Sequence, residues 1–254
     1  MSCSLYRQID FHVHTRLSLC ASRQMCLASI LDAAAQAGIR YLGITDHIDA
    51  YVGPEILNVT RKQLEEIETP IEVFLGCEAD ILAVGKHVVS EEMRSHLDYV
   101  MVSANHFHDP SVAQPRSNSQ ADVAHHFLEM FRYACSLDFA DVIAHPLVVF
   151  PGTYDPGCIE LIRDEEIAEA VKLARDNGIA MEISPRGLES DQYRFRVRFL
   201  SVCKEVGVRF SIGSDAHSLN RIGSTSSLER LLADVGISDS DIWLPSKRGC
   251  WASL

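Results

Sequence analysis

The sequence predicts an α/β fold in a single domain spanning residues 1–254, with its strands arranged as a closed or distorted parallel barrel. Short apolar runs alternate with helix-period segments from end to end, a pattern typical of parallel strands joined by helices. No linker, low-complexity tract or repeat divides the chain. Residue types that bind metals follow most of the strand candidates, and residues beyond the carboxyl ends of barrel strands gather at one face.

Seven short runs, mostly of β-branched or aromatic residues, are typical of buried strands. They cover residues 9–13, 41–45, 71–77, 99–104, 142–144, 179–183 and 208–213. No eighth strand is evident, so we expect a barrel of seven strands or a distorted form of one.

Three segments carry apolar residues at the i, i+3, i+4, i+7 spacing of an amphipathic helix. Their apolar positions are Leu27, Ile30, Leu31 and Ala34; Ile167, Ala170, Val171 and Ala174; and Phe199, Val202, Cys203 and Val206. A glycine follows each segment, where a left-handed residue ends a helix, at Gly38, Gly178 and Gly207. We expect Asp164 to cap the second helix. The polar segment 109–120 is predicted to be the longest loop, and the tail 243–254 either closes the barrel or forms a dimer contact.

Composition narrows the class of protein. Hydrophobic residues make up 47% and charged residues 23% of the 254 positions, which excludes intrinsic disorder. No run of 18 apolar residues exists, so no membrane partner is expected. A net charge of −12 argues against binding long nucleic acid. The N-terminus has no signal-peptide pattern and the eight cysteines form no C-x-x-C pair, so we expect a cytoplasmic protein with reduced thiols.

Histidine or acidic residues accompany the ends of six of the seven strand candidates. They are His12, His14, His47, Glu78, His106, His145, Asp215 and His217. Any one of these histidines alone is most simply an ordinary surface or core residue, but the joint pattern predicts a multinuclear metal site. Imidazole and carboxylate ligands suit Zn, Mn or Fe.

The motifs D-x-H-x-H-T, T-D-H, G-x-E, a mid-chain His, A-H-P and G-S-D-A-H resemble those of the PHP (polymerase and histidinol phosphatase) superfamily. The resemblance runs from Asp10 to about Gly223. It implies a distorted, TIM-like (β/α)7 barrel with two or three divalent ions as cofactors. Members of the superfamily include histidinol-phosphate phosphatases, nucleotide phosphoesterases and exonuclease domains of bacterial DNA polymerases.

The resemblance also implies a role for each residue. It places one ion on His12, His14, Glu78 and Asp215, a second on Glu78, His106 and His145, and a third on His47 and His217. The catalytic residues it implies are Glu78, Asp215 and His217. Hydrolysis would use a water activated by the ions, so no Ser or Cys nucleophile is required.

Two positions depart from the family pattern. Cys20 stands six residues after His14, where the family usually has an acid or a histidine that ligates the third ion. Either Cys20 is a substitute thiolate ligand, or the third site is weak or absent and Cys20 is an inert small residue. The mid-chain ligand is assigned to His106, with His108 as the alternative.

Substrate recognition is assigned to Arg186 and Arg221, which follow strand-end motifs and carry the planar guanidinium that suits phosphate. Glu182 either orients a ligand or a substrate amine or makes an ordinary barrel hydrogen bond. The predicted function is a metal-dependent phosphoesterase acting on a small phosphomonoester, resembling histidinol phosphate or a nucleoside phosphate. The alternatives are a phosphodiesterase or exonuclease on short oligonucleotides, a protein phosphotyrosine phosphatase and, least favoured, a non-catalytic scaffold. The oligomeric state is left open.

Overall fold

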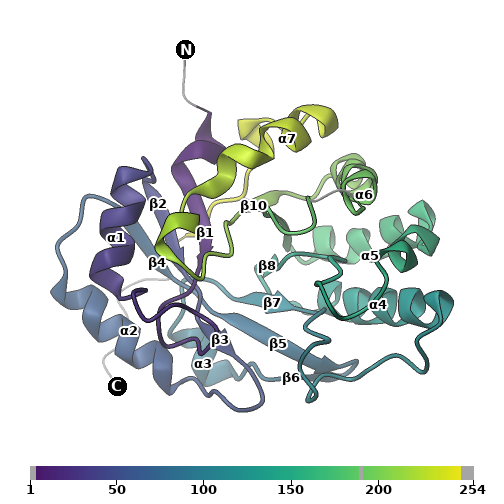
Figure 1. Cartoon of the computed structure of the whole chain (residues 1–254), viewed down its shortest axis with the longest axis horizontal. Coiled ribbons are helices and arrows are strands. Elements are labelled where there is room, and N and C mark those ends of the chain that lie inside the picture. Colours follow the sequence, from purple (N-terminus) through teal and green to yellow (C-terminus); the bar gives the residue numbers. More distant parts are fainter. Residues whose placement is uncertain (1–3, 189–190, 247–254) are drawn as a thin grey trace.

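The computed structural model describes residues 4–188 and 191–246, and within them strands and helices alternate as expected (Figure 1). The strands are β1 (Ile9–Val13), β2 (Tyr41–Ile44), β3 (His47–Ile48), β4 (Glu72–Leu75), β5 (Glu78–Ala83), β6 (Lys86–His87), β7 (Met101–Ser103), β8 (Val142–Ile143), β9 (Ala180–Ile183) and β10 (Phe210–Ile212). The α-helices are α1 (Leu27–Gln36), α2 (Glu55–Glu66), α3 (Glu91–Ser95), α4 (Gln120–Cys135), α5 (Asp164–Asp176), α6 (Tyr193–Val206) and α7 (Glu229–Val235).

Nearly all strand pairs are parallel, which confirms the predicted α/β class. One sheet has the order β1-β2-β4 and the other β10-β9-β8-β7-β5-β3, with β6 antiparallel to β5. The chain passes directly from β2 to β3 and from β4 to β5, so each of these pairs links the two sheets. A bridge between Val13 and Ala216 connects β1 to the segment after β10. The strands therefore follow a barrel-like path without forming one continuous ladder, and helices flank them on both sides in Figure 1.

All seven predicted strands are confirmed, and the structure corrects the third. The run 71–77 is interrupted after Leu75, and a strand that was not predicted, β5, begins at Glu78. The interruption includes Gly76. The Tyr99 ring fills the space that a side chain would need there, because a Cβ at position 76 would lie 2.6 Å from Tyr99 Cζ. His47 likewise begins β3. His47 and Glu78 therefore each lie at the start of one strand and shortly after the end of the preceding strand.

The three predicted helices are confirmed as α1, α5 and α6, each with its apolar row buried. The predicted left-handed glycines are also confirmed, with φ of 77° at Gly38, 75° at Gly178 and 90° at Gly207. The cap prediction is wrong. Asp164 is the first residue inside α5 and Arg163 is the N-cap. The Asp164 carboxylate instead accepts a hydrogen bond of 2.9 Å from Arg198 Nη1 on α6.

Aromatic residues fill part of the barrel interior. The Trp243 ring lies 5.9 Å from the Phe11 ring and 5.7 Å from the Tyr99 ring, both edge-on. The buried Tyr99 hydroxyl donates a 2.6 Å hydrogen bond to the Phe11 carbonyl. The first part of the tail therefore packs into the core, whereas residues 247–254 lie outside the described part of the chain.

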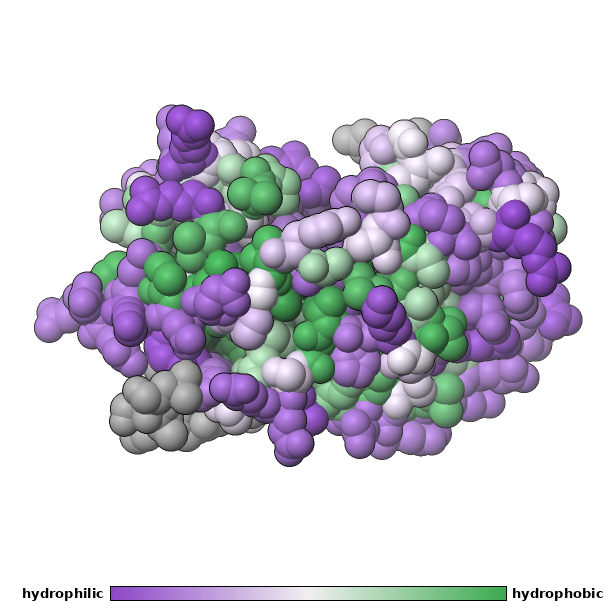
Figure 2. Space-filling view, turned by 90° about the horizontal axis from the view of Figure 1, so that it is seen from below, coloured by the Kyte–Doolittle hydropathy of each residue, from purple (hydrophilic) through white to green (hydrophobic). Residues whose placement is uncertain are grey.

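Seen from below Figure 1, hydrophobic residues gather toward the middle of the surface and hydrophilic ones toward its edges (Figure 2). None of the helices within residues 4–188 and 191–246 is long and apolar enough to cross a membrane. The six cysteines in the described residues are all free thiols, as predicted for a chain without a disulfide framework.

Candidate metal centre

The strand ends bring all eight predicted histidine and carboxylate ligands into one cluster. His12 lies on β1 with His14 just beyond it, His47 begins β3, and Glu78 begins β5. The connections after β7, β8 and β10 supply His106, His145, Asp215 and His217. Six of the eight side chains are buried, and only His47 and His217 are partly exposed.

The Glu78 carboxylate lies at the centre of this cluster. Five imidazole nitrogens surround its two oxygens: Oε2 lies 3.2 Å from His12 Nε2, 3.4 Å from His14 Nε2 and 3.1 Å from His47 Nδ1, and Oε1 lies 2.7 Å from His145 Nε2 and 3.3 Å from His106 Nε2. Because its two oxygens face different histidines, this carboxylate is placed to join two ion positions.

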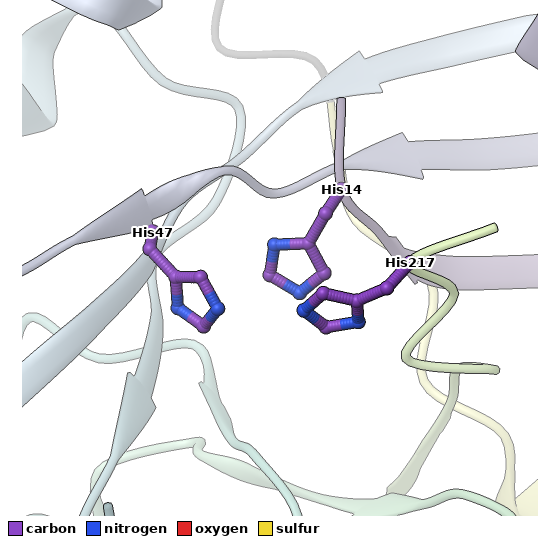
Figure 3. Close-up of side chains that lie close together, drawn as sticks. All are labelled: His14, His47 and His217. Atoms are coloured by element: carbon purple, nitrogen blue, oxygen red, sulfur yellow. The ribbon is translucent and has the colours of Figure 1, made fainter. Parts of the chain in front are cut away.

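The residues present fit divalent metal ions. The buried atoms His12 Nε2, His14 Nε2 and Glu78 Oε2 have no hydrogen-bond partner among the described residues, although buried polar atoms normally do. Three sets have ligand atoms within 4.8 Å of one another: His12, His14 and Asp215; His47, Glu78 and His106; and His14, His47 and His217. Figure 3 shows the last set, whose three rings approach one another from separate segments. Such a donor set is typical of Zn, Mn or Fe sites.

Hydrogen bonds at the far nitrogen fix four of the rings. His12 Nδ1 lies 2.6 Å from Glu182 Oε1, His106 Nδ1 2.7 Å from Asp80 Oδ1, His145 Nδ1 3.1 Å from Asn105 Oδ1 and His14 Nδ1 3.2 Å from Ser18 Oγ. A ring that donates from Nδ1 turns its Nε2 lone pair toward the centre, which is how proteins commonly orient metal-binding histidines.

Sequence reasoning missed Asp80 and left the role of Glu182 open. A signal for Asp80 was present, because Glu78 and Asp80 are two residues apart on β5 and so share one face of the strand. The structure gives Glu182 the role of orienting His12, since its Oε1 contacts that ring.

The variant Glu182→Gln is expected to weaken metal binding about 10- to 100-fold, which is the usual effect of removing a carboxylate that orients a ligand histidine. The amide keeps the shape of the side chain but removes its charge. The affinity is measured by competition with a chromogenic chelator. Glu169→Gln, on the exposed face of α5, is the matched control and should bind like the parent. Unchanged affinity in Glu182→Gln would contradict the orienting role.

Two residues of the cluster have strained backbones. Asp215 has φ of 52° and His145 has φ of 67°, both in the left-handed region that residues other than glycine rarely adopt. Such strain persists only where surrounding contacts enforce it, and it is concentrated at functional sites. Here it turns both side chains into the cluster.

The cluster shifts the pKa values of its own members. Burial opposes ionisation of Glu78, but the neighbouring histidines, His12 first, hold its pKa well below the usual range. Burial lowers the pKa of His217, yet contacts with Asp215 and Cys20 outweigh it and raise that pKa to about 10. Burial raises the pKa of Cys20, and hydrogen bonds to His217 and His47 overcome this and lower it to about 6. Glu78 and the neighbouring rings of His12 and His106 therefore favour each other's charged forms.

A cavity of about 360 Å³ opens over the cluster. Its lining includes Glu78, Asp215, Arg186, Phe150 and both His106 and His108. Arg186 Nε donates a 2.5 Å hydrogen bond to Asp215 Oδ2, and its guanidinium lies 5.9 Å from the Phe150 ring centre.

The structure separates two pairs of candidates. Arg186 lines the cavity, whereas Arg221 is exposed and is not among the lining residues. His106 contacts Glu78 directly. His108 lies beside His106, and the centres of their two rings are 5.2 Å apart. His106 is thus the one of the two histidines that contacts the central carboxylate, and Arg186 is the one of the two arginines that lines the cavity.

These features define a barrel-like α/β protein with a histidine–carboxylate cluster at its strand ends that could hold metal ions. The chain belongs to the PHP domain family, whose model matches residues 10–186.

Relatives and solved structures agree with this assignment. The chain is 27% identical over 236 residues to a probable phosphatase of Photobacterium profundum, covering 89% of this chain and 85% of that protein. It is 26% identical over 237 residues to a probable phosphatase of Clostridium acetobutylicum, covering 89% and 86%. Its fold is similar to histidinol phosphate phosphatase from Lactococcus lactis, solved with zinc, L-histidinol and phosphate, with a TM-score of 0.66, 15% identity and coverage of 94% and 99%.

Proposed function

We propose that this protein is a metal-dependent phosphatase that hydrolyses a small phosphomonoester, and that residues 1–254 act as one PHP barrel domain. The observation that carries the proposal is the Glu78 carboxylate enclosed by five imidazoles, with buried nitrogen and oxygen atoms that lack hydrogen-bond partners in the described part of the chain. A cavity that also exposes a guanidinium lies directly over it. This arrangement supports binding of cations and of an anion side by side.

Each residue of the cluster has a place in the proposal. The ions would be held by His12, His14, His47, Glu78, His106, His145, Asp215 and His217. Divalent ions bound there would neutralise the charge of a phosphate group and activate water for its hydrolysis. Arg186 is placed to bind the phosphate oxygens, because its Nε is held by Asp215 and its remaining N–H groups are left for the cavity.

The relatives support the reaction class, and the fold neighbour suggests substrates. The curated relatives are named probable phosphatases, and the Lactococcus lactis enzyme was solved with L-histidinol and phosphate. Histidinol phosphate and nucleoside phosphates are therefore the first substrates to test.

The test is elemental analysis of the purified protein together with a phosphate-release screen of phosphomonoesters, with and without chelator. Two or three equivalents of Zn, Mn or Fe with chelator-sensitive release are expected. Bound metal without release of phosphate from any phosphomonoester would favour the alternatives: a substrate that is a short oligonucleotide or a protein phosphotyrosine, or a scaffold role without catalysis. A chain that binds no metal even after reconstitution would overturn the proposal.

Substitution of Arg186 is expected to impair substrate binding. Arg186→Met should lower kcat/KM about 10- to 100-fold, since a hydrogen bond to a charged group contributes about 1.5–3 kcal/mol. Arg186→Lys should keep only part of the parent's kcat/KM, because lysine lacks the planar guanidinium that can donate two parallel hydrogen bonds to phosphate. Metal content is measured in parallel, since Arg186 also contacts Asp215.

Arg221→Met is the matched comparison, because Arg221 lies on the short helix Leu219–Arg221 outside the cavity lining. A small effect there with a large effect at Arg186 would support the assignment of the phosphate contact. The reverse result would move that contact to Arg221.

A further inference from the structure

We infer that Cys20 is a thiolate ligand of the metal centre and shares an ion with His47 and His217. The inference rests on the proposed metal-dependent function and adds a sulfur donor to a cluster otherwise made of nitrogen and oxygen ligands.

The backbone holds the Cys20 turn against both histidine segments. On one side, the His47 amide donates a 3.1 Å hydrogen bond to Ser18 Oγ. On the other, the Ser22 amide donates a 2.8 Å hydrogen bond to the His217 carbonyl. Cys20 lies midway between these two anchors, so its position is fixed relative to both histidines.

The Cys20 side chain contacts the same two rings. Cys20, His47 and His217 line the same cavity, and the three side chains interact electrostatically. Cys20 also lines the cavity over the cluster and the adjoining cavity bordered by Asp49 and His108. The sulfur is therefore at the metal cluster and accessible from solvent.

An independent observation points to an ion at this position. His14 is fully buried, and its Nε2 has no hydrogen-bond partner within residues 4–188 and 191–246. The ligand atom of His14 lies within 4.8 Å of those of His47 and His217, and the three rings face a common space (Figure 3). Three imidazoles thus converge beside Cys20, which meets the donor requirement of a transition-metal site.

The other described cysteines do not share this placement. Cys77, Cys135, Cys158 and Cys203 are buried in the hydrophobic core. Cys26 is partly exposed, but its sulfur lies 3.1 Å from Ser29 Oγ and it lines neither cavity. Cys26 is therefore a matched control for Cys20.

A sulfur ligand changes which metals the centre prefers. Thiolates select Zn over Mn or Mg, whereas carboxylates suit the harder ions. The position next to Cys20 should therefore take Zn or Co(II), and Mn should fill it poorly compared with the positions around Glu78.

The test uses the full chain, freed of metal by chelation and titrated with Co(II). A cobalt–thiolate bond gives a charge-transfer band in the near ultraviolet, a signature that nitrogen and oxygen ligands do not give. The parent and Cys26→Ser should show the band, and Cys20→Ser should lose it while cobalt still binds elsewhere in the cluster. Cys20→Asp should also lack the band and should bind Mn more tightly relative to Zn than the parent does.

The outcomes separate the two proposals. Bound cobalt without a charge-transfer band in the parent, or a band that persists in Cys20→Ser, would overturn the assignment of Cys20 and leave the phosphatase proposal standing. No cobalt binding by the parent would overturn both. X-ray absorption of the zinc-loaded parent, which needs no variant, should show one sulfur at about 2.3 Å, and a shell without sulfur would also overturn the assignment.

Discussion

Glu78→Gln is expected to abolish phosphate release, lowering kcat by more than the ~100-fold typical of outer contacts. The substitution keeps the shape of the side chain but removes the charge that faces five imidazoles. It also puts an amide N–H₂ group, which can only donate, in place of one of the two carboxylate oxygens that face the imidazoles. We therefore expect metal content to fall together with activity, as measured by elemental analysis and a phosphate-release assay.

Glu72→Gln is the matched control, because Glu72 is exposed on β4 and has no part in the cluster. Circular dichroism should show that both variants are folded. Retained hydrolysis in a folded Glu78→Gln protein would rule out the role of this carboxylate in joining two ions.

Removal of metal is expected to have the second largest effect, with loss of activity and a lower Tm. A ligand present at ~100 times its Kd stabilises the folded state by about 2.7 kcal/mol. For a chain of this size, that corresponds to a Tm shift of about 5–10 °C. The measurement is thermal unfolding before and after chelation and after addition of Zn or Mn. A Tm and an activity that chelation leaves unchanged would contradict the metal requirement.

The same experiment has a pH dependence with a defined sign. The pKa of His217 is about 10 in the metal-free fold, above its ordinary value, because of Asp215 and Cys20. The protonated ring therefore stabilises the metal-free fold below about pH 6.5, and this stabilisation is lost as pH rises through 10. Protons compete with metal at this ring, so metal affinity should rise with pH over that window.

The sequence predicted which residues gather in the cluster because each is tied to a local pattern. His12 and His14 are two residues apart at the end of β1, so they share one face of the strand, and Asp215 and His217 follow the carboxyl end of β10, where parallel strands converge. The β4–β5 break was not predictable in this way. It coincides with Gly76, where Tyr99, 23 residues further along the chain, leaves no room for a side chain.

The contacts that orient the ligands were harder to predict, because they depend on side-chain conformation in the folded protein. Asn105 reaches His145 across 40 residues, and Glu182 reaches His12 across 170. The difference between Arg186 and Arg221 has the same origin. Both follow strand-end motifs, but only the path of the folded chain puts Arg186 into the cavity.

The Asp215 carboxylate has a further consequence, because it serves two neighbours at once. One oxygen faces the rings of His14 and His217, and the other accepts from Arg186. An ion bound to the first oxygen and a phosphate bound to the Arg186 guanidinium would therefore both depend on the charge of the same Asp215 carboxylate. Their binding free energies must be coupled, and thermodynamic reciprocity requires that each change the affinity of the other by the same factor. Occupancy of the proposed metal centre would thus set how tightly the protein binds phosphate.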